Sequence, residues 1–319
     1  MKIIFFGTPQ FASEILQKII SKHEVVCVVT TLDTKKGRGK KFLPSNVKET
    51  ANKLNIPVLQ PENLNEKKFI DDLKKFNADL FAVIAFRKLP KEVWEIPNRG
   101  TINLHTSLLP NYRGAGPINW VLINGEKTTG ITTFFINDKI DTGDIILQKE
   151  INITENMTAA QLHNSMIIEG IEIINKTIDC ISKNKVKKFT QPQSNGFKKA
   201  PKIKKDLLKI NWNKSALEVH NLIRGLSPYV DKYTMLSDVS ICPSAWFFLN
   251  NKRVKIYKAS LTDKINQNST IDTNNKTYLN INFEDKALSI EVIQMEGKKS
   301  MEIKQFLQGR KINDKDFIN

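Results

Sequence analysis

The stretch that decides the fold is GTINLHTSLLPNYRGAGPINWVL, residues 100–122. Apolar and polar residues alternate over residues 101–105, the pattern of a half-buried strand, so we expect Asn103 and His105 on one face of that strand. A glycine-containing loop follows, and Pro117 stands where a helix can begin. The order of strand, loop and helix predicts an amide and an imidazole at the C-terminal edge of a sheet, where open α/β folds bind ligands.

A second motif, IDTGDI at residues 140–145, follows the expected strand over residues 128–136. A carboxylate beside a histidine stabilises the imidazolium form, and an amide together with a charged imidazole can stabilise an oxyanion. The set of Asn103, His105 and Asp141 contains no Ser, Thr or Cys nucleophile, which favours direct acyl transfer to an outside amine. Taken singly, a strand histidine and an Asp-Thr-Gly-Asp turn also have ordinary structural explanations.

Outward from this stretch, the chain has the pattern of an α/β protein. Residues 2–6, 11–20 and 24–30 fit strand, helix and strand, which is a parallel βαβ unit. Gly7-Thr8-Pro9 in its first turn is not Gly-x-Gly-x-x-Gly, so we infer no dinucleotide cofactor. Short alternating segments between residues 245 and 295 predict a small barrel of the OB type, without an aromatic stripe that would prove base stacking.

We therefore expect a Rossmann-like, mostly parallel sheet with helices on both faces, followed by a smaller C-terminal OB-like β-barrel domain. A lysine-rich segment with few acids marks the join between the two parts. The expected segments are residues 1–189 for the first domain, 190–208 for a basic linker and 209–319 for the second domain.

The net charge of +16 over 319 residues, with a pI of about 9.6, fits a polyanionic partner such as RNA. A genome rich in Lys, Asn and Ile would also raise the lysine content, so clustering is the better criterion. Basic residues cluster in two places. In the first cluster, five of the eight residues from 34 to 41 are basic: Lys35, Lys36, Arg38, Lys40 and Lys41. The second cluster lies between residues 183 and 209 and includes Lys204 and Lys205.

Cysteine and histidine spacing gives no indication of a metal site. Cys27, Cys180 and Cys242 are far apart, and no second His or Cys stands at ligand spacing near His105. Isolated thiols favour a reducing compartment, and the opening residues lack the features of a signal peptide. We expect a cytoplasmic protein without metal and without a membrane segment.

Several motifs together resemble the 10-formyltetrahydrofolate-dependent formyltransferases, and most of all those acting on methionyl-tRNA. They are Asn-x-His-x-Ser-Leu-Leu-Pro from Asn103, then Tyr112-Arg113-Gly114, then Asp-x-Gly-Asp from Asp141. The opening Gly-Thr-Pro turn and the closing segment also match, so the resemblance covers nearly the whole chain. Two departures stand near the expected pocket: Ala85-Phe86-Arg87 replaces Ala-Tyr-Gly, and Asn137 and Lys139 replace the usual Asp and Gly.

The resemblance implies that 10-formyltetrahydrofolate binds at the C-terminal edge of the sheet and that the acceptor is methionyl initiator tRNA. It implies catalytic roles for Asn103, His105 and Asp141. The implied folate-binding residues are Phe86, Leu89, Ser107, Leu108, Leu109, Pro110 and Asp144. It further implies that both basic clusters and the C-terminal domain contact tRNA, with Arg38 at the end of the acceptor stem.

Three alternatives remain open from the sequence. A formyltransferase acting on a nucleotide-linked amino sugar would share the Asn-His-Asp set but would not need the basic loop. A formyltetrahydrofolate hydrolase would use water in place of the amine. An RNA-binding protein without catalysis would not need all three of Asn103, His105 and Asp141.

Overall fold

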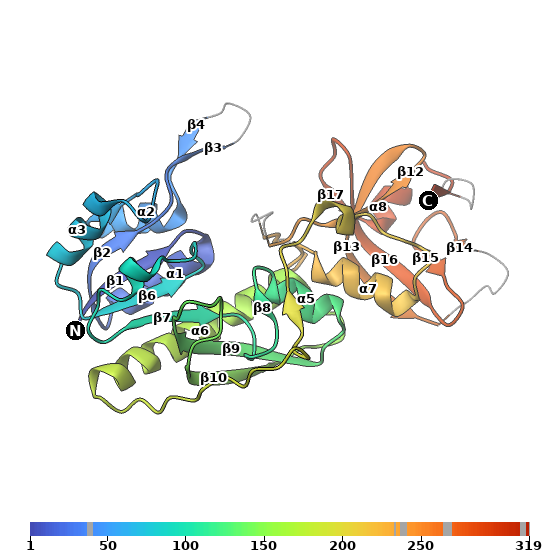
Figure 1. Ribbon diagram of the computed structural model, residues 1–319. Coiled ribbons are helices and arrows are strands. Elements are labelled where there is room, and N and C mark those ends of the chain that lie inside the picture. Colours follow the sequence, from blue (N-terminus) through green and yellow to red (C-terminus); the bar gives the residue numbers. More distant parts are fainter. Residues whose placement is uncertain (37–40, 233, 237–240, 264–269, 313–316, 319) are drawn as a thin grey trace. The chain divides into compact units, whose positions relative to one another are not determined.

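The computed structural model describes residues 1–36, 41–232, 234–236, 241–263, 270–312 and 317–318. The chain forms two compact units (Figure 1). Unit 1 comprises Met1–Gly114, Gly130–Ile151 and Ser165–Lys199, and unit 2 comprises Ala115–Thr129, Asn152–Asn164 and Ala200–Asn319. The units therefore interleave along the sequence, whereas the segments 1–189, 190–208 and 209–319 are consecutive. This grouping describes packing, so those domain boundaries stay a prediction.

Unit 1 is built on a seven-stranded sheet in the order β10-β9-β7-β6-β1-β2-β5. Its strands are β1 (Lys2–Gly7), β2 (Glu24–Val29), β5 (Val58–Leu59), β6 (Leu80–Ile84), β7 (Thr101–His105), β9 (Thr128–Phe135) and β10 (Ile145–Asn152). The pairs from β5 through β2, β1 and β6 to β7 are parallel, and β9 joins β7 antiparallel. The continuous apolar runs of β1 and β6 are buried, as strands covered on both faces must be.

Helices cover both faces of this sheet. They are α1 (Gln10–Ile20), α2 (Asn46–Lys53), α3 (Lys67–Lys75), α4 (Lys91–Trp94) and α6 (Ala159–Ser182). Phe69 of α3 and Val93 of α4 join Phe6 and Phe81 in one buried cluster. On the other face, Gly170 of α6 approaches the Cδ1 atoms of Ile15 and Leu104. The predicted α/β fold is confirmed, and Ile102 and Leu104 are buried as the alternation in β7 requires.

Unit 2 contains an antiparallel sheet in the order β14-β15-β16-β13-β12-β18, with β17 paired to β16. Its strands are β12 (Ala245–Leu249), β13 (Lys252–Thr262), β14 (Ile271–Thr273), β15 (Leu279–Asn282), β16 (Ala287–Met295), β17 (Ser300–Glu302) and β18 (Phe317–Ile318). Helices α5 (Pro117–Ile123), α7 (Ala216–Gly225) and α8 (Ile303–Leu307) complete it. The alternating strands bury one face, and the predicted smaller C-terminal β domain is confirmed.

Shorter elements lie between these parts: β3 (Thr34–Lys36), β4 (Lys41–Leu43), β8 (Arg113–Gly114), β11 (Lys199–Ala200) and the 3-10 turn η1 (Lys205–Leu208). Helices begin and end where the sequence signals them. Ser45 caps α2 by accepting the N–H of Lys48, and Ser215 with Glu218 forms a capping box at α7. Among the described residues, no helix combines the length and apolar composition needed to cross a bilayer.

Helix α7 carries three buried polar side chains, His220, Asn221 and Arg224. Arg224 donates from Nε to Asn221 Oδ1 at 2.8 Å, and its guanidinium also reaches the carbonyls of Met157 and Leu122. His220 is 1% exposed one turn earlier. Burial, and then the charge of Arg224, lower the pKa of His220 from 6.5 to about 4.

This lowered pKa predicts a loss of stability in acid. The unfolded chain takes up a proton at His220 below its ordinary pKa, whereas the folded protein resists it until about 4, so stability is complete above that ordinary value and declines as the pH falls. Between roughly pH 7 and pH 5 we expect a loss of about 2 kcal/mol through this group. In His220→Phe, the free energy of unfolding should fall by about 2 kcal/mol less than in wild type between these pH values. Urea titrations followed by fluorescence at both pH values measure this difference. Equal pH dependence in variant and wild type would contradict this expectation.

Candidate active site

Strand β7 places Asn103 and His105 on one face, as the alternation predicts. Asn103 pairs with Val83 of β6 and Phe134 of β9, and His105 pairs with Thr132 of β9. The His105 side chain is buried, and Asn103 is half-buried. The face they share with Val83 lies opposite the one on which Leu104 packs.

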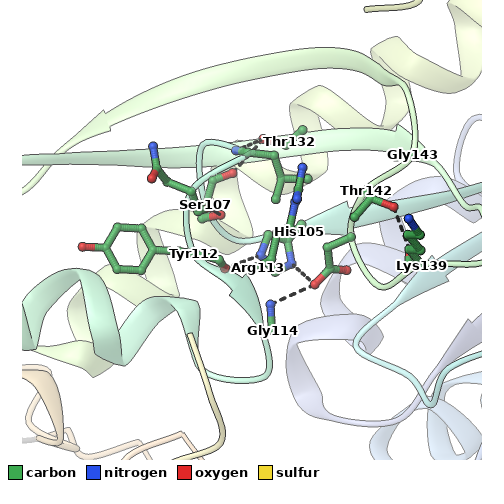
Figure 2. Close-up of polar contacts among 12 residues, drawn as sticks. His105, Ser107, Tyr112, Arg113, Gly114, Thr132, Lys139, Thr142 and Gly143 are labelled. Carbon is green, nitrogen blue, oxygen red and sulfur yellow. Dashed lines mark hydrogen bonds and ion pairs between the residues drawn. The ribbon is translucent and has the colours of Figure 1, made fainter. Parts of the chain in front are cut away.

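The imidazole of His105 lies between two loops (Figure 2). Its Nε2 is 2.8 Å from the carbonyl oxygen of Tyr112, and because a carbonyl only accepts, Nε2 carries the hydrogen in this contact. Its Nδ1 is 3.8 Å from Oδ2 of Asp141, too long for a hydrogen bond but close enough for an ion pair when the ring is charged. The same Oδ2 accepts the backbone N–H of Gly114 at 2.9 Å. The backbone N–H of Gly114 therefore holds the Asp141 carboxylate toward His105.

The turn that carries Asp141 has a tight backbone. Asp141 has a φ of 55°, a left-handed conformation that Asp tolerates better than most residues. Two residues later, a Cβ on Gly143 would overlap the carbonyl oxygen of Phe135, so only glycine fits this close approach. Asn137 Oδ1 accepts the N–H of Lys139 and the hydroxyl of Thr142. Asn137, one of the residues that depart from the family pattern, therefore stabilises the turn by hydrogen bonds to two of its residues.

Gln191 is a site residue that the sequence analysis missed. Its Nε2 donates to the carbonyls of Asp141 (3.1 Å) and Gly143 (2.8 Å). Its Oε1 accepts the guanidinium of Arg113 at 2.6 Å from Nη2. The side chain is 4% exposed, so it links the loop after β7 to the Asp141 turn from within the structure. A glutamine in a lysine-rich segment, with a second glutamine two residues away, gives no signal by which it could have been found.

The segment Ser107–Pro110 is fixed by two further residues that the sequence analysis missed. Thr132 Oγ1 donates to the Ser107 carbonyl at 2.7 Å and accepts the N–H of Leu109 at 3.1 Å. Gln148 donates to both Thr132 Oγ1 and the Leu109 carbonyl. The Ser107 hydroxyl donates to the carbonyl of Asn111, and Leu109 is buried while Leu108 and Pro110 are half-buried. The other expected folate residue of this region, Asp144, accepts the hydroxyl of Thr190 at 2.9 Å.

Phe86 and Leu89 lie on a separate loop after β6. The Phe86 ring packs on Phe6 with centroids 5.8 Å apart, and Leu89 lines a cavity of about 500 Å³ between residues 62–65 and 87–90. Arg87 stands where the family has glycine. Its guanidinium donates to the carbonyls of residues 61 and 62, which ties the two walls of this cavity together. The unusual residue is thus anchored in the wall of the cavity.

The expected basic residues belong to both units, with the first cluster in unit 1 and Lys204 and Lys205 in unit 2. Lys35, Lys36 and Lys41 lie in the antiparallel pair β3–β4, which brings the two ends of the basic segment together. Arg38 and Lys40 lie outside the described residues. Lys204 and Lys205 begin the turn η1 in unit 2, where the expected linker is locally ordered and Ile203 and Leu208 pack on the core. Among the described residues, no group of three His, Cys, Asp or Glu side chains could hold a metal ion.

Comparison with known families matches both parts of the chain. Residues 1–178 match the model described as "Formyl transferase", and residues 202–311 match "Formyl transferase, C-terminal domain". The chain is 44% identical over 320 residues to the methionyl-tRNA formyltransferase of Flavobacterium johnsoniae, with 98% of each chain covered. It is 43% identical to the enzyme of that name from Clostridioides difficile, again with 98% of each covered.

Solved structures share the fold at lower identity. A sugar 3N-formyl transferase, WlaRD, has a TM-score of 0.65 with 24% identity and covers 94% of this chain and 99% of its own. HypX from Aquifex aeolicus has a TM-score of 0.63 with 16% identity and covers 98% of this chain and 49% of its own. These likenesses support the fold.

The position of Gln191 generates a stability prediction. Gln191→Ala leaves the buried carbonyls of Asp141 and Gly143 and the guanidinium of Arg113 without this partner, and we expect a loss of about 2 kcal/mol in the free energy of unfolding. Gln193→Ala, an exposed glutamine two residues away, is the matched control and should change little. Urea titrations measure both. An equal effect of the two substitutions would rule out the bridging role of Gln191.

Proposed function

The chain belongs to the formyl transferase family, and from that premise we propose that it transfers the formyl group of 10-formyltetrahydrofolate to the α-amine of methionyl initiator tRNA. The product is N-formylmethionyl-tRNA, which starts translation. The observation that carries this proposal is the full-length similarity to enzymes named methionyl-tRNA formyltransferase, together with His105 and Asp141 facing each other beside Asn103. The formyl donor is a substrate of the reaction, and no step requires a metal ligand.

In the proposed mechanism, Asn103 and His105 stabilise the negative charge that develops on the formyl oxygen when the amine attacks the formyl carbon. Nε2 of His105 is already engaged with the Tyr112 carbonyl, so Nδ1 is the ring nitrogen left to donate toward the reacting oxygen or toward a water. Asn103 contributes its amide from the same strand face two residues away. The imidazole of His105 is oriented by the Tyr112 carbonyl before the charge forms, which is the condition under which such a donor is most effective.

Asp141 has a different role in this mechanism. Its carboxylate faces Nδ1 of His105 and is fixed by the N–H of Gly114, so it favours the charged imidazole and can order a water that carries protons from the amine to the leaving nitrogen. The attack joins the amine nitrogen to the formyl carbon, and the bond to N10 of the folate then breaks. The proton lost by the amine is the one that the departing nitrogen gains.

The formyl donor would be held by the two loops at this sheet edge. Phe86 and Leu89 supply an aromatic and an aliphatic wall, and the cavity of about 500 Å³ beside Leu89 falls in the size range of small-molecule sites. The segment Ser107–Pro110, rigidified by Thr132, and Asp144 would contact the donor outside the cavity beside Leu89, whose walls are residues 62–65 and 87–90. The buried hydroxyl and carbonyl pairing of this segment leaves it little freedom to move.

The acceptor would be recognised largely through its charge. We assign tRNA phosphate contacts to Lys35, Lys36, Arg38, Lys40, Lys41, Lys204 and Lys205, and the end of the acceptor stem to Arg38. Such contacts position a nucleic acid without reading much of its sequence. We also propose a catalytic domain over 1–189, a linker over 190–208 and a tRNA-binding domain over 209–319, acting as a monomer in the bacterial cytoplasm.

The first experiment supplies the purified protein with 10-formyltetrahydrofolate and either methionyl initiator tRNA or a nucleotide-linked amino sugar. Formyl transfer to the tRNA supports the proposal. Transfer to the sugar alone would favour the alternative enzyme, release of formate without an acceptor would indicate a hydrolase, and binding without transfer would indicate an RNA-binding protein.

Substitutions at the three central residues should separate their roles. Asn103→Ala and His105→Ala each remove a donor to the developing oxyanion, so kcat should fall about 100-fold or more with little change in KM for the tRNA. Asp141→Asn should lower kcat comparably, because the uncharged amide no longer stabilises imidazolium. Asn98→Ala, an exposed asparagine before β7, is the control. Near-full turnover in Asn103→Ala and His105→Ala would refute the assignment.

Recognition by charge predicts a steep dependence on salt. If about four phosphates are neutralised, raising NaCl from roughly 50 to 200 mM should weaken tRNA binding about a hundredfold, because condensed counterions are released on binding. Affinity measured by fluorescence anisotropy with labelled tRNA gives the slope. Binding of the less charged formyl donor, measured over the same range, serves as the control and should change far less. A flat slope would count against RNA as the substrate.

A further inference from the structure

One face of the unit 2 sheet carries exposed and half-buried side chains that the core does not use. We define the β12–β13 outer face by Trp246 and Phe248 of β12 and by Arg253 and Lys255 of β13. The two strands pair antiparallel, with Trp246 opposite Lys255 and Phe248 opposite Arg253. Residues directly opposite in such a pair have side chains on the same side of the sheet, so the four form one patch. Figure 1 shows the two strands side by side.

The alternation of β12 separates this face from the core. Ala245, Phe247 and Leu249 are buried, and the Phe247 ring meets Trp212 edge-on at 5.3 Å between centroids. Trp246 and Phe248, between them, are half-buried and point to the other side of the sheet. Two large aromatic side chains thus lie outside the core of unit 2. The sequence analysis missed them, since AWFFL does not by itself show which residues face the core.

The patch combines aromatic rings with a stacked cation. The guanidinium of Arg253 lies 4.4 Å from the centroid of the Trp246 ring, and the rings of Trp246 and Phe248 meet edge-on at 5.2 Å. Arg253 is exposed on its outer side, and Lys255 stands beside Trp246. An exposed guanidinium that lies over an indole offers a planar cation on which a nucleobase can stack. Glu296 is the nearby acid, and its N–H donates to the Arg253 carbonyl.

We propose that the β12–β13 outer face binds an unpaired base of the tRNA, with Trp246 and Arg253 as the stacking platform and Lys255 on the adjoining phosphate. This inference rests on the proposed function and names the residues with which unit 2 would contact the tRNA. Interleaved aromatic and basic side chains on a sheet are the composition that single-stranded nucleic acid requires. The net charge of +16 supplies the long-range attraction, and the patch supplies a contact that depends on shape as well as charge.

The contacts among Trp246, Phe248 and Arg253 could instead serve only to stabilise the sheet. Cross-strand aromatic and cationic pairs stabilise an exposed sheet face without any ligand. The two roles differ in what they need from residue 253. Stabilisation of the sheet depends on the folded protein alone, whereas a stacking platform contributes only when RNA is present. Arg253→Lys keeps the charge but removes the planar group, so it separates stacking from simple attraction.

The test compares Trp246→Leu, Trp246→Tyr and Arg253→Lys with wild type in steady-state formyl transfer, varying the methionyl-tRNA concentration. We expect Trp246→Leu to raise KM for the tRNA about tenfold with kcat unchanged, and Trp246→Tyr to restore most of the loss, because base stacking requires an aromatic ring. Arg253→Lys should raise KM severalfold. Lys286→Ala, an exposed lysine in the turn before β16, is the matched charge control and should leave KM near the wild-type value.

A binding measurement tests the same face without catalysis. The protein has four tryptophans, and titration with uncharged tRNA should quench the part of the fluorescence that Trp246→Tyr removes. Lys255→Ala should lower the salt slope of binding by about one unit. Unchanged KM and affinity in both Trp246→Leu and Arg253→Lys, in variants that unfold at the wild-type temperature, would overturn the inference. A wild-type protein that quenches with tRNA but formylates nothing would refute the proposed function and leave this binding face standing.

Discussion

The hydrogen bond from the Gly114 N–H to the Asp141 carboxylate joins two segments that are far apart in sequence. The loop after β7 and the turn between β9 and β10 each have irregular backbone, with left-handed φ values at Tyr112 (61°) and Asp141 (55°). Such conformations cost energy unless the surroundings hold them. Here the Tyr112 carbonyl is occupied by His105 and its N–H by the Lys198 carbonyl. The position of the Asp141 carboxylate is thus fixed by a backbone N–H, in a turn that the neighbouring strands β9 and β10 hold in place.

Gln191 extends this constraint to a third segment. One amide side chain accepts from Arg113 and donates to two carbonyls of the Asp141 turn, so the loop and the turn cannot move independently without leaving buried polar groups unsatisfied. Arrangements that stabilise a developing charge work best when their dipoles are oriented beforehand. The Tyr112 carbonyl orients His105, and Gln191 holds the turn of Asp141, at the cost of left-handed backbone at Tyr112 and Asp141 and a close approach at Gly143.

The sequence predicts the parts of this arrangement that follow from periodicity and side-chain type. Alternation in residues 101–105 places Asn103 with His105 and buries Ile102 and Leu104, as found. The roles of Gln191 and Thr132 could not be predicted, because their partners lie in segments that only the fold brings near. The pairing of residues 34–36 with residues 41–43 on either side of the basic segment was not predicted, because a run of three residues is too short to show strand alternation.

Trp246 and Phe248 show that alternation alone cannot predict which face of a strand is buried. Period-two alternation in residues 245–249 tells which side chains share a face, but all of Trp246, Phe247 and Phe248 are aromatic, so hydrophobicity does not say which face is buried. The decision comes from the edge-on packing of Phe247 on Trp212, which turns its neighbours outward. In β7 the polar face needs buried partners, because His105 is enclosed. In β12 the outer face is partly exposed, and Arg253 contacts the Trp246 ring without burying it. Enclosure suits a group that must be oriented for chemistry, and partial exposure suits one that must meet a large substrate.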